Sequence, residues 1–146
     1  MDLGRRIMRD YEAVFNESYA RVLGSGHDEF DFFYKFYDRF TDATEEIKRK
    51  FENTDMTKQV KLLKKSLQHM LALFITKQVS DYMEQIAVMH NQKNLDIKPH
   101  LYDTWLDCLV ENVKDFDSKF DSDVELAWRL VMSPGIAFMK FQYGNS

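Results

Sequence analysis

The chain has few of the residues that break helices or cross-link a protein. Its 146 residues include 2 Pro, 5 Gly and 1 Cys. A single cysteine, Cys108, excludes an intramolecular disulfide framework and fits a reducing compartment, so we expect a cytoplasmic protein. The longest strongly apolar run, 70–75, is far too short to span a membrane. No apolar segment follows residues 1–6, so no signal peptide is predicted.

The chain also lacks a strong excess of charge of either sign. The net charge is −4 with both signs interspersed, which gives no electrostatic argument for nucleic-acid binding. Hydrophobic residues make up 45% and aromatic residues 14%, including 12 Phe and 8 Met. Such side chains pack well around a flat apolar ligand, although ordinary helical cores use the same residues. The length predicts one domain over residues 1–146.

Helical periodicity runs through almost the whole chain, and no segment alternates with period two over a useful length. The sequence therefore predicts an all-α protein. Asp28 is expected to cap the second helix, and Ser122-Asp-Val-Glu125 is predicted to be a capping box. Pro134 is expected to kink the last helix or to cost it a hydrogen bond. The predicted helices cover about 6–23, 30–40, 44–50, 55–74, 80–90, 99–113 and 122–139.

His90 is the candidate metal ligand. It ends an amphipathic helix over 81–90, and Ile86 lies one turn before it on the same face. A neutral imidazole on an apolar helix face is what an iron porphyrin needs for an axial ligand. A lone histidine in such a place is, however, more often an ordinary core residue. The three other histidines lie in a loop, off the apolar face of a long helix, or at a helix start: His27, His69 and His100.

The order and spacing of residues before His90 resemble those of bacterial globins, including the globin domains of flavohaemoglobins and sensor-type globins. The stretch from Phe36-Tyr-Asp-Arg39 to Phe51 is similar to the family's second helix and the corner that follows it. Phe51 matches the aromatic residue that stacks on the haem, and Tyr37, fourteen residues earlier, matches the tyrosine of the distal pocket. Within 54–63, the family's distal polar position falls on Gln59.

The resemblance continues to the end of the chain. Tyr102 and Trp105 match the haem-facing positions of the next helix. Residues 121–143 are similar to the last helix of single-domain and sensor-type globins, through Ala127-Trp-Arg129 and Pro134-Gly-Ile-Ala137. Three further apolar positions complete the expected haem-binding set: Leu63, Ile86 and Ile97. Two departures stand out: Glu45 replaces the usual proline of the corner helix, and the loop after His90 is about two residues longer than in flavohaemoglobins.

The resemblance implies a globin fold of seven to eight helices that encloses a pocket for haem b. It also implies reversible binding of dioxygen, carbon monoxide and nitric oxide at iron held by His90. Bound dioxygen carries partial negative charge, so a phenol donor at Tyr37 and an amide donor at Gln59 would slow its release. A register one residue earlier would put Lys58 in the place of Gln59. No catalytic residue is assigned.

Three other functions remain open at this point. One is nitric-oxide dioxygenation with a separate reductase. Flavohaemoglobins support the proximal histidine with a glutamate from the last helix, and no Asp or Glu follows Glu125 here, which weighs against it. Another is a gas or redox sensor that acts through a partner protein, and the third is a haem-free interaction module. A homodimer is also consistent with the sequence, whereas membrane and nucleic-acid partners are not expected.

Overall fold

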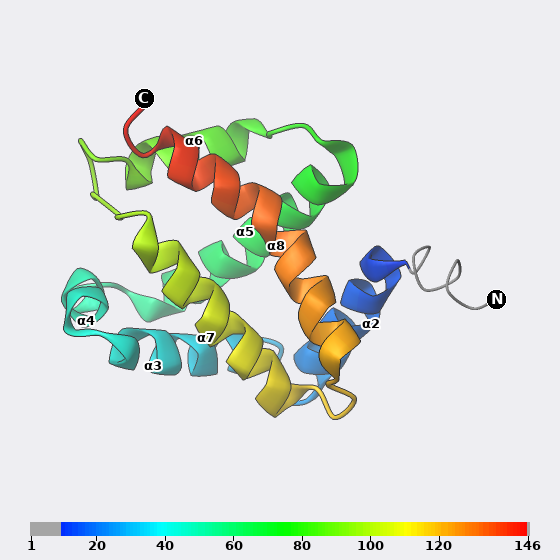
Figure 1. Ribbon diagram of the computed structural model, residues 1–146. Coiled ribbons are helices and arrows are strands. Elements are labelled where there is room, and N and C mark those ends of the chain that lie inside the picture. Colours follow the sequence, from blue (N-terminus) through cyan, green and yellow to red (C-terminus); the bar gives the residue numbers. More distant parts are fainter. Residues whose placement is uncertain (1–9, 146) are drawn as a thin grey trace.

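The computed structural model describes residues 10–145, which form seven helices and no strand (Figure 1). The predicted all-α class is confirmed. No helix among these residues combines the length and the apolar character needed to cross a membrane. The helices are α2 (Tyr11–Gly24), α3 (Asp31–Ala43), α4 (Glu45–Phe51), α5 (Met56–Thr76), α6 (Asp81–His90), α7 (His100–Phe116) and α8 (Ser122–Gln142).

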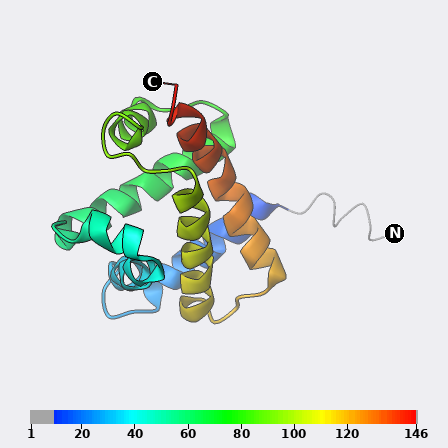
Figure 2. The ribbon, with the colours of Figure 1, turned by 60° about the vertical axis from the view of Figure 1, so that its left-hand side comes forward.

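The last helix, α8, is the centre of the packing. It contacts α2, α5, α6 and α7, while α3 packs against α7, α4 and α5. Helices α5 and α8 approach closely at Gly135, where an added Cβ atom would lie 2.8 Å from Cε of Met70. Glycine therefore sets the distance between these two helices. The turned view shows α6 beside the end of α8, joined to α7 by an extended loop (Figure 2).

Most predicted helix limits agree with the structure, but two predicted caps are wrong. Asp28 does not cap α3, because its carboxylate accepts from the N–H of Phe30, the residue before the helix. No side chain caps the start of α3 within the described residues. Ser122 is the first residue of α8 rather than its cap. The cap is Asp121, whose Oδ1 accepts from the N–H of Val124 at 2.9 Å. The predicted start of the first helix at residues 6–9 lies outside the described residues.

Pro134 lies inside α8, which continues on both sides of it. Because proline has no N–H, the carbonyl of Leu130 loses its donor within the helix, as the sequence led us to expect. Leu130 is 38% exposed, so water can reach this part of the helix. Cys108, on α7, is half-buried and packs against the core.

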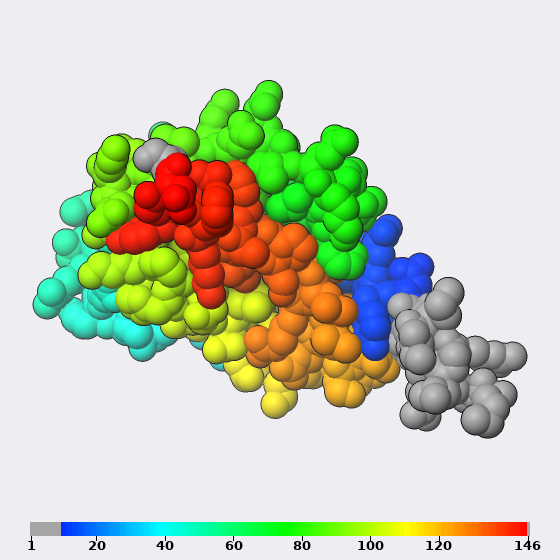
Figure 3. All heavy atoms as spheres, turned by 45° about the horizontal axis from the view of Figure 1, so that its top comes forward, coloured from blue at the N-terminus to red at the C-terminus, as the bar shows by residue number. Residues whose placement is uncertain are grey.

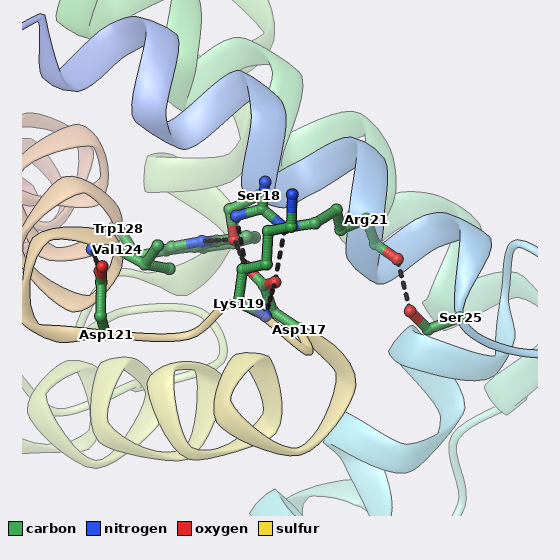
Figure 4. Close-up of polar contacts among 8 residues, drawn as sticks. All are labelled: Ser18, Arg21, Ser25, Asp117, Lys119, Asp121, Val124 and Trp128. Carbon is green, nitrogen blue, oxygen red and sulfur yellow. Dashed lines mark hydrogen bonds and ion pairs between the residues drawn. The ribbon is translucent and has the colours of Figure 1, made fainter.

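A buried carboxylate joins α2 to the segment between α7 and α8 (Figure 4). Asp117 accepts hydrogen bonds from Ser18 Oγ at 2.6 Å and from Arg21 Nε at 2.6 Å and Nη2 at 2.9 Å. The Ser18 oxygen in turn accepts from Nε1 of Trp128 on α8 at 2.9 Å. Burial alone would raise the pKa of Asp117, but the bonds from Arg21 and Ser18 outweigh it and hold the pKa below its usual value.

Replacing Asp117 with asparagine should therefore destabilise the protein by roughly 2–3 kcal/mol, because it leaves the donors of α2 without their charged acceptor. The folded-state pKa is depressed, so this stabilisation is present above the unfolded pKa of about 3.9 and is lost as pH falls through the folded value. Urea unfolding at pH 7 and pH 3 measures both effects. Asp115→Asn, which alters the exposed pair with Arg39, is the matched control and should change stability by less than about 1 kcal/mol.

Candidate functional site

His90 is the last residue of α6, and both ends of that helix are fixed. At its start, Ser80 Oγ accepts from the N–H of Met83 at 3.2 Å. After its end, Asn91 is buried and its side-chain oxygen accepts from two backbone N–H groups of the following turn. Asp96 then adopts a left-handed conformation with φ 53°, and the N–H of Ile97 donates to the carbonyl of His90 at 3.0 Å. The loop therefore folds back on the histidine.

Two neighbouring elements hold this loop in place. The N–H of Gln92 donates to the carbonyl of Tyr143, just beyond α8, at 3.0 Å. On the opposite side, Lys50 Nζ of α4 donates to the carbonyl of Leu95 at 3.2 Å. Glu46 of the same helix contacts Nε2 of His100 at 3.1 Å. The position of His90 is thus set by α4 and α8 as well as by its own helix.

Among residues 10–145, the imidazole of His90 has one polar partner, the phenol of Tyr102 on α7. Nδ1 lies 3.2 Å from the Tyr102 oxygen, and the two ring centroids are 6.4 Å apart. Burial lowers the pKa of His90 to about 4, so the ring is neutral at pH 7. Burial also raises the pKa of Tyr102, which keeps its phenol neutral. When Nδ1–H donates to this oxygen, Nε2 carries the lone pair that a metal ion requires.

The distal residues named from the sequence lie together on α3 and α5. Tyr37 is 4% exposed, and its oxygen accepts a hydrogen bond from Nε2 of Gln59 at 3.1 Å. Burial raises the pKa of Tyr37, while the bond from Gln59 acts in the opposite direction. The phenol therefore keeps its proton and can donate it to a further acceptor. Lys58 is exposed, so Gln59 is the residue that α5 turns toward Tyr37.

Phe51 completes this distal group. It is the last residue of α4, and its ring centroid lies 5.5 Å from that of Tyr37 and 5.9 Å from that of Phe40. Short helix α4 begins with Thr44, whose Oγ1 accepts from the N–H of Ile47 at 3.1 Å. This cap and the buried Ile47 fix the direction in which α4 delivers Phe51.

The remaining predicted residues connect the two groups. Leu63, one turn after Gln59, is buried, and Ile86, one turn before His90, packs against the core. On α7, Trp105 lies one turn after Tyr102, and its ring centroid is 6.0 Å from that of Phe36. Phe36 in turn contacts Tyr37, with centroids 5.2 Å apart. An aromatic path therefore runs from the distal group on α3 to the helix that carries Tyr102.

The donor set fits haem better than a metal ion held by side chains alone. No group of three or more His, Cys, Asp or Glu side chains among residues 10–145 is placed to hold a metal ion. Haem iron needs only one protein ligand, because the porphyrin supplies four nitrogen atoms. A neutral, buried imidazole with an oriented Nδ1 and a buried phenol at Tyr37 are groups that suit such a cofactor.

Sequence reasoning missed the contact between His90 and Tyr102. It assigned Tyr102 to the haem-facing side of α7 and noted only that the last helix offers no carboxylate to support His90. The absence of a carboxylate after Glu125 on the last helix was the signal in the sequence that His90 has a different partner. A histidine that ligates a metal nearly always donates its second N–H to an acceptor, so a ligand role for His90 predicts another oxygen nearby. The Tyr102 oxygen lies 3.2 Å from Nδ1.

Comparison with solved structures finds a Pseudomonas aeruginosa protein whose crystal structure is described as structurally highly homologous to a human haemoglobin. The two structures superpose with a TM-score of 0.85 at 33% sequence identity. The match covers 93% of this chain and 100% of the other. No protein-family model matches the chain, and no curated protein matches it in sequence.

Proposed function

Because the chain belongs to the globin family, we propose that it binds haem b through His90 and takes up dioxygen and other diatomic gases reversibly. The observation that carries this proposal is the neutral, oriented imidazole of His90, with Nδ1 directed to Tyr102. When bound, haem supplies an iron atom whose sixth coordination position is open to a gas molecule. Contacts between α2 and α8, near opposite ends of the chain, support a single globin domain.

On the proximal side, the protein orients the ligand and keeps it neutral. The contact with Tyr102 fixes the plane of the His90 ring. The loop after α6 holds the backbone of His90 in place, because the N–H of Ile97 donates to the His90 carbonyl. Ile86 and Ile97, the apolar positions that the resemblance assigns to the proximal side, pack against the core. Burial lowers the pKa of His90 to about 4, so the ring stays neutral well below pH 7 and keeps the lone pair with which it would bind iron.

On the distal side, the protein supplies one hydrogen-bond donor in apolar surroundings. Gln59 donates to the Tyr37 oxygen, which directs the phenol proton away from Gln59. A ligand with negative charge on its outer atom would receive this proton as a hydrogen bond. Such a bond stabilises dioxygen more than carbon monoxide and slows dioxygen release. Slow release suits sensing, scavenging or ligand chemistry better than bulk delivery.

The proximal geometry favours gas binding over nitric-oxide dioxygenation. A carboxylate that accepts from Nδ1 gives the histidine imidazolate character, whereas a neutral phenol accepts weakly and leaves it an ordinary imidazole. His90 contacts the phenol of Tyr102, and no carboxylate within the described chain contributes to its pKa shift. Dioxygenation with an external reductase and sensing through a partner protein are the alternatives to this proposal.

Absorption spectra of the purified protein test the proposal directly. We expect a Soret band in the ferric and ferrous forms that moves sharply when carbon monoxide is added to the ferrous form. No Soret band after haem is supplied would overturn the proposal and leave an interaction role for the fold. Rapid turnover of nitric oxide with dioxygen and an added reductase would instead favour the enzymatic alternative.

Removing the proximal hydrogen bond should weaken haem retention without abolishing it. In Tyr102→Phe we expect haem to transfer to apomyoglobin about tenfold faster, because loss of a partner behind a metal ligand costs about 10- to 100-fold in affinity. The iron–histidine stretching frequency should fall at the same time, because Nδ1–H loses its acceptor. Tyr11→Phe, far along the chain on α2, is the matched control and should change neither quantity.

A further inference from the structure

The helix that carries Gln59, α5, has a basic outer face in an otherwise acidic chain. Residues 56–80 contain five lysines and neither Asp nor Glu. The rest of the chain carries 24 Asp and Glu against 15 Lys and Arg, a net charge of −9, whereas the whole chain has −4. The turn that joins α5 to α6, in green, lies at the surface in the space-filling view (Figure 3). Positive charge is therefore concentrated on this part of the surface.

Three lysines lie along one face of α5 and are exposed. Lys58, Lys61 and Lys65 follow one another at spacings of three and four residues, which places them on one side of the helix. Within the part of the chain that the structure describes, Lys64 is the α5 lysine that forms an ion pair, with Glu29 at 2.9 Å. The three exposed ammonium groups therefore have no carboxylate partner there, and they remain available to charges on another molecule.

An apolar and an aromatic side chain lie among these lysines. Leu62 is 45% exposed and follows Lys58 by four residues on the same face. Lys65 Nζ lies 4.5 Å from the ring centroid of Tyr82 on α6, and the Tyr82 hydroxyl donates to the Leu62 carbonyl at 3.4 Å. We call these five residues the basic face: Lys58, Lys61, Leu62, Lys65 and Tyr82. An apolar centre with a charged border is the usual composition of a protein interface.

The basic face lies outside the distal group of the candidate site. Gln59 and Leu63 turn inward from the same part of α5. Tyr82 is close enough to Tyr37 to contribute to the raised pKa of the Tyr37 phenol. An α-helix is about 10–12 Å across, so a group docked on the basic face lies about one helix diameter from the distal group. Electron transfer through protein weakens steeply with distance, so this is a favourable place for electrons to enter.

We propose that the basic face docks an acidic electron-transfer protein, whose carboxylates surround its own redox group and which reduces the haem iron. The proposal rests on the proposed haem function, because dioxygen binds ferrous iron and a ferric haem needs an electron from a separate donor. One electron passes from the docked donor, which is oxidised, to ferric iron, which becomes ferrous, and no bond or proton is transferred. Opposite charges on the two proteins steer them together and speed their encounter.

A small acidic protein fits the basic face better than an extended polyanion does. The three free lysines form a small positive area on a chain whose remainder has a net charge of −9. A nucleic acid or an anionic membrane surface extends past this area and would meet the negative remainder of the chain. Electron-transfer complexes, in contrast, are transient and bury less than about 1,200 Å² in total.

Stopped-flow reduction of the ferric, haem-loaded protein tests the proposal, with a reduced plant-type [2Fe–2S] ferredoxin as the acidic one-electron donor and carbon monoxide to trap the ferrous form. At about 10 mM salt, the double variant Lys58→Glu, Lys61→Glu should lower the second-order rate at least about tenfold, because it reverses charges that attract the donor. The difference should shrink at about 0.5 M salt, where screening leaves only short-range attraction.

The control is the double variant Lys35→Glu, Lys114→Glu, which makes the same change in net charge at exposed positions of α3 and α7. Its rate should stay within about twofold of wild type, because these charges lie away from the docked donor. Photoreduced lumiflavin, a neutral donor, should reduce all three proteins at the same rate. A basic-face variant as fast as wild type at low salt, or an equal loss in the control, would overturn the proposal.

Amide chemical shifts locate the docked protein without relying on electron transfer. Adding the ferredoxin to the ferrous carbon-monoxide form should shift the signals of residues 57–66 and leave those of α7 in place. A normal Soret band with unshifted α5 signals would contradict the docking alone, whereas absence of a Soret band would contradict the proposed haem function. Phosphatidylglycerol vesicles or a DNA duplex that shift the α5 signals at lower concentration than the ferredoxin would overturn the assignment to a protein partner.

Discussion

Replacing His90 with glycine should abolish stable haem binding and the carbon-monoxide-dependent Soret shift. Loss of a group behind a metal ligand costs about 10- to 100-fold in affinity, so loss of the ligand itself should exceed about 100-fold. Within the part of the chain that the structure describes, the imidazole has its polar contact with Tyr102 and burial keeps the ring neutral, so no described ion pair depends on His90. The glycine variant should therefore fold, and its circular dichroism should match that of the wild-type apoprotein.

Free imidazole should restore the spectrum of the glycine variant, because it can occupy the vacated space and place a nitrogen on the iron. His27→Gly is the control. It removes a histidine from the exposed loop between α2 and α3 and should leave haem binding unchanged. A His90→Gly protein that binds haem and carbon monoxide like wild type would show that another residue holds the iron. The proximal assignment would then be wrong.

The helices were predictable because their apolar residues repeat at helical spacing and few residues interrupt them. The limits of α6 followed from Ser80 and from the break after His90, and both lie where the sequence placed them. The predicted caps of α3 and α8 were wrong because capping depends on the local backbone conformation. Asp28 and Asp121 both precede helices, and only the backbone conformation decides which carboxylate reaches the first free N–H groups.

The distal and proximal halves of the candidate site differ in how much of their geometry the sequence predicts. The resemblance to bacterial globins implied that Tyr37 and Gln59 lie together on the distal side, and the structure places them in hydrogen-bond contact. The partner of His90 depended on how the longer loop 91–99 returns to α7, which no spacing rule supplies. The loop turns at Asp96, which has a left-handed conformation, and it brings α7 back beside His90. Tyr102 then points at Nδ1.

The sequence did not show which apolar residues of α8 are exposed. Leu126, Leu130 and Phe141 could equally have faced the core, since α8 buries residues on the opposite side, including Trp128 and Met132. A helix that is apolar nearly all round is normally buried on all sides. Within the described residues, α2, α5, α6 and α7 pack against α8 and leave these three side chains exposed, which could be found only from the structure.

Replacing Tyr37 with phenylalanine should increase the dioxygen dissociation rate about 10- to 150-fold. The phenol is the buried donor of the distal group, and a hydrogen bond to a charged acceptor contributes about 1.5–3 kcal/mol. Stopped-flow mixing of the dioxygen complex with excess carbon monoxide measures the rate. Carbon monoxide release should change far less, since that ligand carries little negative charge and gains little from the donor.

The control is Tyr34→Phe, the same substitution one turn earlier on α3, where the side chain is 40% exposed. It should leave both dissociation rates as they are in wild type. Gln59→Leu should raise dioxygen release less than Tyr37→Phe, because Gln59 donates to the Tyr37 oxygen and so acts through its orientation. The double variant should then resemble Tyr37→Phe alone, with the two effects far from additive. If the two effects multiply instead, Gln59 contacts the gas independently, and the distal arrangement argued from the hydrogen bond is wrong.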